Sequence, residues 1–166
     1  MTTGAPARLD RAPLYTPEQR RRRDATVWTT VQGVLAPVQF VVFLVSLGLV
    51  VRFLATGEGL WAATVSVVVK TAVLYAIMVT GSIWEKVVFD RWLCAPAFFW
   101  EDVVSFGVIA LHTLYLWALF AGWPAESQAW IALAAYAAYL VNAVQFLLKL
   151  RSARLDEAQG MTGAPA

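Results

Sequence analysis

Long, uninterrupted apolar segments make up most of the chain, and the polar residues gather between them. Four windows are mainly apolar over about 20 residues or more, the length that lets an α-helix cross a hydrocarbon core of about 30 Å. These windows are about Val31–Leu54, Leu60–Ile83, Val103–Gly122 and Ala129–Leu148. Lipid cannot hydrogen-bond an open backbone, and the runs are continuous rather than alternating, so helices are predicted rather than a membrane β-barrel. The pattern therefore predicts an all-α, polytopic membrane protein built as a bundle of four transmembrane helices.

Composition and charge strengthen this prediction. Hydrophobic residues make up 60% and charged residues 14% of the 166 residues, whereas a soluble domain has about 45–50% and about 25%. The charged side chains fall almost entirely in residues 1–30, 84–102 and 149–157. A net charge of +2 with localised Arg residues argues against a nucleic-acid partner. The single Cys94 excludes an intrachain disulfide, and one sulfur does not make a metal site.

The basic residues near the ends of the windows predict the orientation of the bundle, because cytoplasmic ends of membrane helices carry an excess of Lys and Arg. Four crossings put both termini on one side. The basic residues of that side are Arg20, Arg21, Arg22, Arg23, Lys86, Arg91, Lys149, Arg151 and Arg154. The turns on the opposite side have only Arg52 nearby. Both termini are therefore expected to be cytoplasmic.

Residues 14–155 are expected to form a single membrane domain. Residues 1–13 and 156–166 are rich in Gly, Ala, Pro and Thr without apolar periodicity, and are expected to be disordered tails. The two short turns should join the helices as antiparallel hairpins. Residues 84–102 are expected to form a cytoplasmic loop between the hairpins.

Each predicted helix carries a polar side chain at about the same depth. Lys70 and His112 lie near the middle of the second and third windows, and Gln39 and Asn142 take similar places in the first and fourth. Such residues are costly in lipid, so they either hydrogen-bond one another or bind a ligand. Burying the Lys70 ammonium requires a specific partner or a depressed pKa. His112 has three interpretations: a core histidine, a ligand to the metal of a pigment, or a proton carrier. The fourth window also carries a stripe at helical spacing, which consists of Tyr136, Tyr139, Asn142, Gln145 and Lys149.

The connection between the second and third windows is unusually aromatic and also carries acids. Trp84 precedes Glu85 at one end, and Trp100 precedes Glu101 and Asp102 at the other. Because the two helices are consecutive and antiparallel, these acids should meet at one depth. Crowding and partial burial would raise the pKa of one acid, as general acid–base chemistry on a flat apolar substrate requires. The competing interpretations are a connector lying in the headgroup region, an N-cap for Asp102 and a helix-dipole partner for Glu101.

Several motifs resemble those of the 3-vinyl bacteriochlorophyllide hydratase family (chlorophyllide a hydratases) of phototrophic bacteria. The matching segments are Leu14–Arg20, Val31–Pro37, Ser82–Phe89, Ala95–Ser105, Ala110–Thr113 and Val141–Leu150. The resemblance covers about residues 14–155. It implies a hydro-lyase of bacteriochlorophyll biosynthesis that adds water across the C3 vinyl group of chlorophyllide a or 3-vinyl bacteriochlorophyllide, giving a 1-hydroxyethyl group. It also implies an inner membrane of the bacterium, cytoplasmic or intracytoplasmic, as the location, and other enzymes of the pathway as neighbours.

Such a hydration starts with a proton on the terminal vinyl carbon, after which water attacks the adjacent cation. The reaction needs no redox cofactor. We interpret Glu101 as the proton donor and Glu85 or Asp102 as the residue that positions water. The protein is expected to hold no metal of its own, although His112 is a candidate ligand to the substrate magnesium, and Lys86, Arg91 or Lys149 a candidate partner of the substrate propionate. The full set of expected substrate-binding residues is Lys70, Trp84, Lys86, Arg91, Trp100, His112, Asn142, Gln145 and Lys149.

Two other functions fit the same residues. A membrane carrier or assembly factor would bind a chlorin without changing it. A proton-coupled transporter would use Lys70 and His112, but no clear repeat and no broken helix pair supports it. Chemical conversion of a vinyl chlorin discriminates the hydratase from both.

Overall fold

The structure, a computed structural model, describes the backbone of residues 14–162 and the side chains of residues 14–155. Over this part, the chain forms α-helices without strands: α1 (Pro17–Ala25), α2 (Val27–Thr56), α3 (Leu60–Phe89), α4 (Phe99–Phe120) and α5 (Ala125–Thr162). All of them except α1 are long and apolar enough to cross a membrane, giving 4 spans. This confirms the predicted all-α, multi-pass architecture. The expected tails at residues 1–13 and 163–166 lie outside the described residues.

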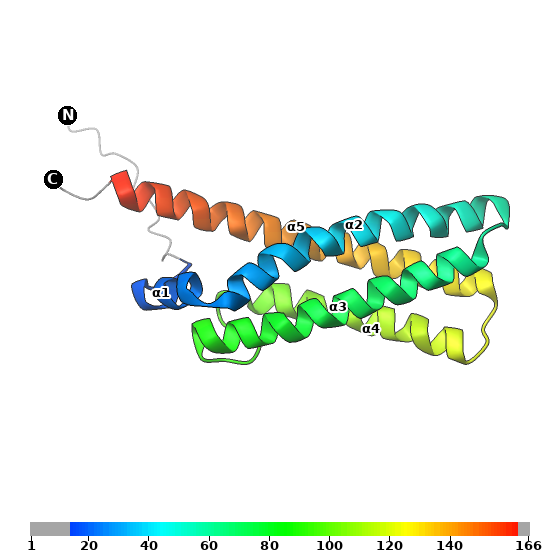
Figure 1. The fold of residues 1–166 in the computed structure, drawn as a ribbon, viewed down its shortest axis with the longest axis horizontal. Helices are drawn as coiled ribbons and strands as arrows, with labels where there is room; N and C mark the ends of the chain where they lie inside the picture. The colour runs from blue at the N-terminus through cyan, green and yellow to red at the C-terminus, as the bar shows by residue number, and fades with distance from the viewer. Residues whose placement is uncertain (1–13, 163–166) are drawn as a thin grey trace, which may run out of the picture.

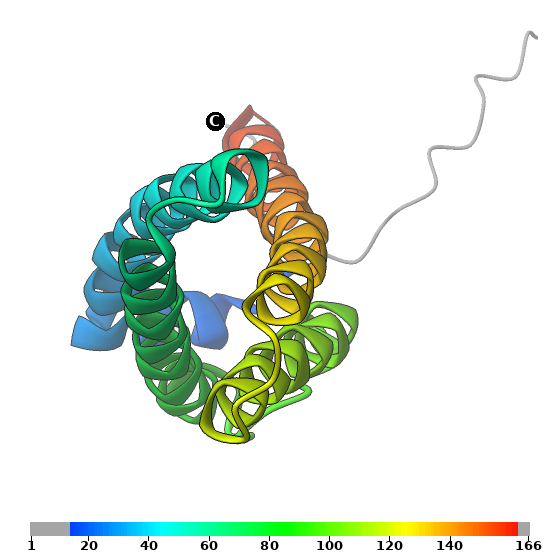
Figure 2. The ribbon, with the colours of Figure 1, turned by 90° about the vertical axis from the view of Figure 1, so that its right-hand side faces the viewer.

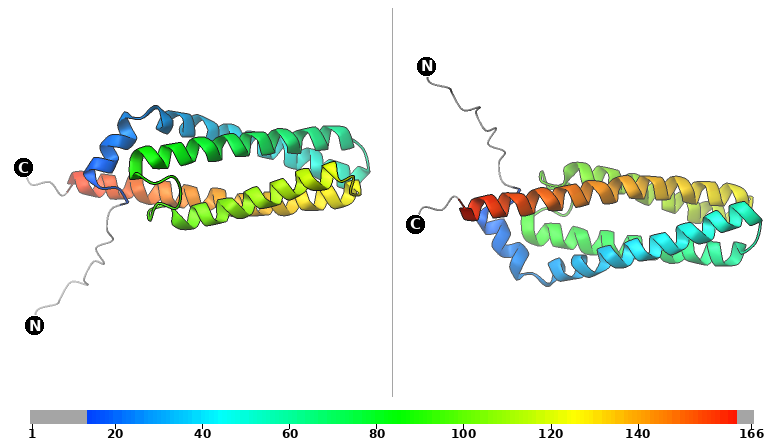
Figure 3. Two further views of the ribbon diagram at one scale, coloured as in Figure 1. Left: turned by 90° about the horizontal axis from the view of Figure 1, so that it is seen from below. Right: turned by 90° about the horizontal axis from the view of Figure 1, so that it is seen from above.

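The four long helices form two antiparallel hairpins, α2 with α3 and α4 with α5 (Figure 1). Both short turns lie at one end of the bundle, and α1 and the α3–α4 loop lie at the other. Seen along the bundle, the four helices surround a central region (Figure 2), and the side views show the hairpins lying against each other (Figure 3). The loop between α3 and α4 thus connects the two hairpins.

Left-handed glycines make the turn of the first hairpin. Gly57 has φ 73°, and its N–H donates to the Phe53 carbonyl, which ends α2. Gly59 has φ 81° directly before α3. A residue with a Cβ is strained in this region, whereas glycine adopts it readily. The chain therefore reverses within residues 57–59.

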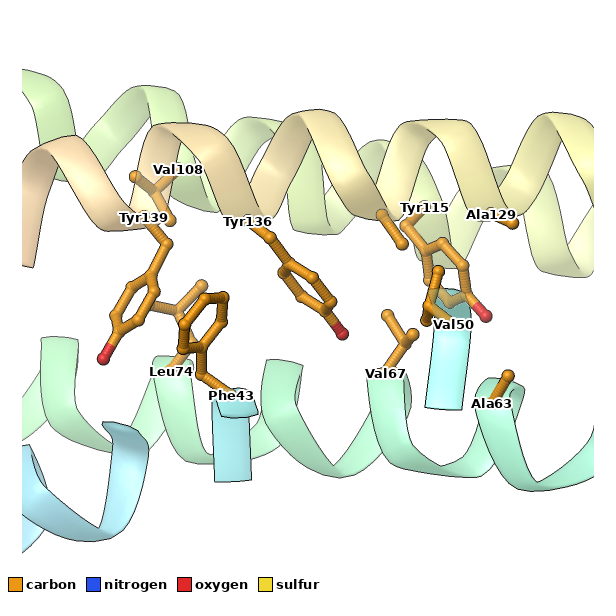
Figure 4. Packing of buried hydrophobic residues seen from close by; sticks show 11 residues of the cluster. Phe43, Val50, Ala63, Val67, Leu74, Val108, Tyr115, Ala129, Tyr136 and Tyr139 are labelled. Carbon is orange, nitrogen blue, oxygen red and sulfur yellow. The ribbon is translucent and has the colours of Figure 1, made fainter. Parts of the chain in front are cut away.

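Aromatic side chains fill the centre between the hairpins. Tyr136 and Tyr139 point from α5 toward α2 and α3, where Phe43 lies between them (Figure 4). The Phe43 ring is 5.5 Å from the Tyr136 ring and 5.0 Å from the Tyr139 ring. The Tyr136 hydroxyl also hydrogen-bonds Ser46 of α2 over 2.5 Å. We call this interior region the seam and define it by Gln39, Phe43, Lys70, His112, Tyr136 and Tyr139.

The helices extend beyond the apolar windows from which they were predicted. Helix α3 continues to Phe89 and α4 begins at Phe99, so the loop covers residues 90–98 and the expected loop of residues 84–102 is wrong in its bounds. Helix α5 likewise continues past residue 148 to Thr162. The reason is that hydropathy marks where a segment leaves the hydrocarbon, whereas backbone hydrogen bonding decides where the helix ends. Helix α3 stops at Asp90, which has φ 61° and donates its N–H to the Lys86 carbonyl.

Candidate active site

Two buried carboxyl groups meet where α3 and α4 approach the connecting loop. Glu85 of α3 and Asp102 of α4 are 5% and 4% exposed. The backbone N–H groups of the adjacent residues Ala95 and Cys94 bind one acid each, so the two carboxyl groups lie close together and interact. Two buried carboxyl groups side by side favour a proton on one of them, because two adjacent negative charges repel each other. We call Glu85 and Asp102 the carboxyl pair. Because the two acids lie together, they can hold one proton between them.

The loop supplies backbone donors to both members of the carboxyl pair. The Ala95 N–H donates to Glu85 Oε2 over 3.1 Å, and the Cys94 N–H donates to Asp102 Oδ2 over 2.7 Å. Cys94 adopts a left-handed backbone with φ 57°, at the point where these consecutive N–H groups meet the two acids. The N-cap interpretation of Asp102 is wrong, because the N-cap of α4 is Phe98 and Asp102 lies one turn inside the helix.

Glu101 faces a different partner. Its Oε1 is 3.1 Å from Lys149 Nζ of α5, and its Oε2 is buried without a hydrogen-bond partner in the described part of the chain. Deeper on the same interface, Asn142 donates to the Ser105 hydroxyl over 2.8 Å, and Ser105 donates to the Glu101 carbonyl over 2.8 Å. Gln145, half-buried on α5, has an amide oxygen that lacks a described partner. Polar groups therefore join α4 to α5 beside the carboxyl pair.

The two expected tryptophan walls take different positions. Trp84 packs edge-on against Phe89 and Phe98, with ring centroids 5.7 and 5.6 Å away, and donates its indole N–H to Thr29 over 2.9 Å. Trp100 is 69% exposed, and among the described rings it contacts its neighbour Phe99 edge-on. The structure thus places Trp84 half-buried against the loop and the start of α2, and Trp100 on the outer surface of α4.

The basic residues expected to bind a propionate lie near the loop. Lys86 is paired with Asp90 over 2.6 Å, and Arg91 is exposed. Lys149 is ion-paired with Glu101. The structure leaves Arg91 and Lys86 at the surface of this end of the bundle.

A second polar group lies deeper, in the seam. Lys70 and His112 are each 0% exposed and Gln39 is 2% exposed. The Lys70 ammonium lies 3.9 Å above the Tyr139 ring centroid. His112 Nδ1 is 2.8 Å from the Val108 carbonyl, so in the neutral ring Nδ1 carries the hydrogen and Nε2 presents a lone pair. Within residues 14–155, no group of three or more His, Cys, Asp or Glu side chains is arranged so that it could hold a metal ion.

Sequence reasoning missed the backbone donors of Cys94 and Ala95. The direction of these N–H groups depends on the left-handed backbone of Cys94. A residue other than glycine seldom adopts this conformation, so a single sequence does not reveal it. The helix α1 was also missed, although its signal is visible: Thr16 and Gln19 form a capping box at its start.

The Cys94 thiol provides a probe of the charge on the carboxyl pair. Burial raises the pKa of this thiol, and the negative charges of Asp102 and Glu85 raise it further. Because the thiolate reacts with alkylating agents, Cys94 should react slowly at neutral pH and faster as pH rises. If the pair shares one proton, Asp102→Asn keeps one negative charge and leaves the alkylation rate within about twofold. The double variant Glu85→Gln/Asp102→Asn removes that charge and should increase the rate by about tenfold, one pKa unit.

The control for this measurement is Asp90→Asn, which changes an exposed carboxylate next to the same loop. A stepwise increase, in which Asp102→Asn alone already accelerates alkylation several-fold, would mean that both acids are ionised.

Taken together, four helices long and apolar enough to cross a membrane and two buried carboxyl groups at one end define a multi-pass membrane protein with a buried acidic site. The chain belongs to the 2-vinyl bacteriochlorophyllide hydratase family, whose model matches residues 15–152. The difference between 2-vinyl and 3-vinyl is one of nomenclature, so the resemblance drawn from the sequence motifs is confirmed.

Two relatives support this membership. The chain is 71% identical over 143 residues to the 2-vinyl bacteriochlorophyllide hydratase of Cereibacter sphaeroides, an alignment that covers 86% of this chain and 89% of the relative. It is 65% identical over 159 residues to the protein of the same name from Rhodobacter capsulatus, covering 96% of this chain and 93% of that relative. No solved structure matches the chain.

Proposed function

We propose that the chain hydrates the C3 vinyl group of chlorophyllide a or 3-vinyl bacteriochlorophyllide to a 1-hydroxyethyl group, with the carboxyl pair as proton donor. Membership of the hydratase family makes the chain a hydro-lyase of bacteriochlorophyll biosynthesis. The observation that carries the assignment of the donor is the burial of Glu85 and Asp102 side by side, each with a backbone N–H on its carboxyl group. An inner membrane of the bacterium, with both termini in the cytoplasm, is the proposed location.

The pair delivers its proton to the terminal vinyl carbon, and the electron pair of the double bond forms the new C–H bond. The cation left on the adjacent carbon is delocalised into the macrocycle. Water attacks this carbon and loses a proton to the carboxylate that has just formed, which restores the pair. The sum is the addition of one water molecule with no change in the enzyme.

The carboxyl pair suits the donor role better than Glu101, the residue favoured by the sequence. Glu101 is ion-paired with Lys149 over 3.1 Å, and protonating it would break that pair. The carboxyl pair instead has two backbone donors that stabilise the charge left after proton transfer. Glu101 and Lys149 are proposed to hold α4 against α5 and so to keep Asp102 in place.

His112 is proposed to ligate the magnesium of the substrate. Its Nδ1 is held by the Val108 carbonyl over 2.8 Å, and its Nε2 has no described partner. A ring nitrogen oriented by a hydrogen bond on the opposite nitrogen is the usual arrangement of a metal-ligating histidine. Asn142 and Gln145 would line the path between this ligand and the pair.

The test is conversion of a 3-vinyl chlorin by membranes that contain this protein and no other enzyme of the pathway. The product should absorb at shorter wavelength, because conjugation with the vinyl group is lost. In water labelled with heavy oxygen, the label should appear in the new hydroxyl group. Membranes lacking the protein are the control. Bound but unchanged pigment would instead indicate a carrier.

A further inference from the structure

Two side chains of the first hairpin present buried polar atoms that the bundle does not satisfy. The ammonium of Lys70 and both amide atoms of Gln39 have no hydrogen-bond partner among the side chains and backbone described. The Lys70 ammonium lies over the Tyr139 ring, 3.9 Å from the ring centroid. A buried ammonium and a buried amide without hydrogen-bond partners are costly in a low-dielectric interior. The Lys70 ammonium and the Gln39 amide N–H can donate hydrogen bonds, so an acceptor oxygen of a ligand would satisfy these two donors.

The polar groups of the seam follow a fixed order along the bundle. His112 is ten residues from Asp102 along α4, and Lys70 is fifteen residues from Glu85 along α3. At 1.5 Å per residue, His112 is about 15 Å and Lys70 about 22 Å from the carboxyl pair along the helix axes. The order is therefore carboxyl pair, then His112, then Lys70.

The substrate of the proposed function carries its functional groups in a matching order. In chlorophyllide-type chlorins, the vinyl group and the ring ketone lie at opposite edges of the macrocycle, with the metal between them. The propionate is attached on the side of the ketone. We infer that Lys70 and Gln39 bind an acceptor oxygen at the edge of the macrocycle opposite the vinyl group, so that the substrate lies lengthwise in the seam. This inference rests on the proposed function.

This placement changes the expectation for the propionate. Lys86 and Arg91 lie near the loop, at the end of the bundle where the vinyl edge would meet the carboxyl pair. The ketone and propionate would lie at the opposite edge, deeper in the seam. A flat apolar ring can replace the packing of Phe43 on Tyr139 and the contact of Tyr139 with Lys70, since neither is a hydrogen bond.

The experiment measures pigment binding to the purified full-length protein, using three metallated 3-vinyl chlorins. The first has the ketone and a free propionate, the second lacks the ketone oxygen, and the third has the propionate as its methyl ester. Wild type should bind the first pigment about tenfold or more tightly than the second or the third, as expected for a hydrogen bond to a charged donor. Lys70→Met should lose this discrimination. If Lys70→Met no longer discriminates the first pigment from the second, the ketone is the partner of Lys70. If the variant no longer discriminates the first pigment from the third, the partner is the propionate.

A spectroscopic signature separates binding from a structural role. If the ketone is the partner, its C=O stretching band in the resonance Raman spectrum of bound pigment should lie at lower frequency in wild type than in Lys70→Met. Lys70→Met removes a buried charge and is expected to fold; thermal unfolding checks this. Arg52→Met, which removes a cation at the far turn, is the matched control.

Discrimination that persists in Lys70→Met, or equal affinity of wild type for all three pigments, would overturn the inference. Wild-type protein that fails to hydrate any vinyl chlorin would instead overturn the proposed function, so the two failures are distinguishable.

Discussion

Glu85→Gln should lower kcat for vinyl hydration by about 10²–10⁴-fold, the usual contribution of a positioned general acid. The glutamine side chain keeps an oxygen that can accept the Ala95 N–H, now 3.1 Å from Glu85 Oε2. It cannot share a proton with Asp102, so the loop geometry is retained while the proton is lost. Pigment affinity should change little, because the side chain acts on the reacting group alone. Measured kcat and pigment Kd on the same membrane preparation test both statements.

Glu101→Gln is the matched comparison, because it is the same chemical change in a neighbouring buried acid. It breaks the ion pair with Lys149 but leaves the carboxyl pair intact. The expected loss of kcat is therefore smaller, about tenfold or less. If Glu101→Gln were inactive and Glu85→Gln active, the proton donor would be Glu101, as the sequence alone suggested.

His112→Ala should weaken binding of magnesium or zinc chlorins by about 10–100-fold, the range in which weakened metal–ligand contacts reduce metal affinity. The fraction of pigment that still binds should be hydrated at a rate close to that of wild type. The reason is that His112 lies about 15 Å along the helix from the carboxyl pair and does not touch the reacting carbon. Pigment titration followed by absorption, together with single-turnover conversion of bound pigment, separates the two quantities.

Metal-free chlorin is the control for His112. Wild type should prefer the metallated pigment, and His112→Ala should bind the metallated and metal-free pigments equally. An unchanged preference in the variant would show that His112 is a core histidine whose Nδ1 simply caps the Val108 carbonyl.

The spans and the family were readable in the sequence because they depend on patterns along the chain. A continuous apolar run of sufficient length has to be a helix in lipid, whatever its neighbours. The antiparallel order of consecutive helices likewise follows from short turns, and it correctly brought Glu85 and Asp102 to one end. The motifs around Trp84-Glu85 and Trp100-Glu101-Asp102 were enough to place the chain in its family.

The roles of the individual acids depended on contacts between distant residues. Glu101 and Asp102 are adjacent on one helix and chemically alike, yet one reaches Lys149 across to α5 and the other reaches Glu85 on α3. Neighbouring residues point about 100° apart on a helix of 3.6 residues per turn, so packing decides which helix each one faces. The same is true of Trp84 and Trp100, which share a sequence context, although one is half-buried and the other is exposed.

The sequence by itself therefore determined the membrane class, the pairing of helices and the chemistry available at one end of the bundle. Only the tertiary structure decided which acids lie side by side, where the backbone donors of Cys94 and Ala95 point, and which polar atoms of the seam lack a partner among the described residues. The physical reason is the separation along the chain over which each interaction acts. Hydrophobic burial and helix formation respond to local periodicity, whereas a hydrogen bond requires two specific atoms, often far apart in the chain, to lie about 3 Å apart.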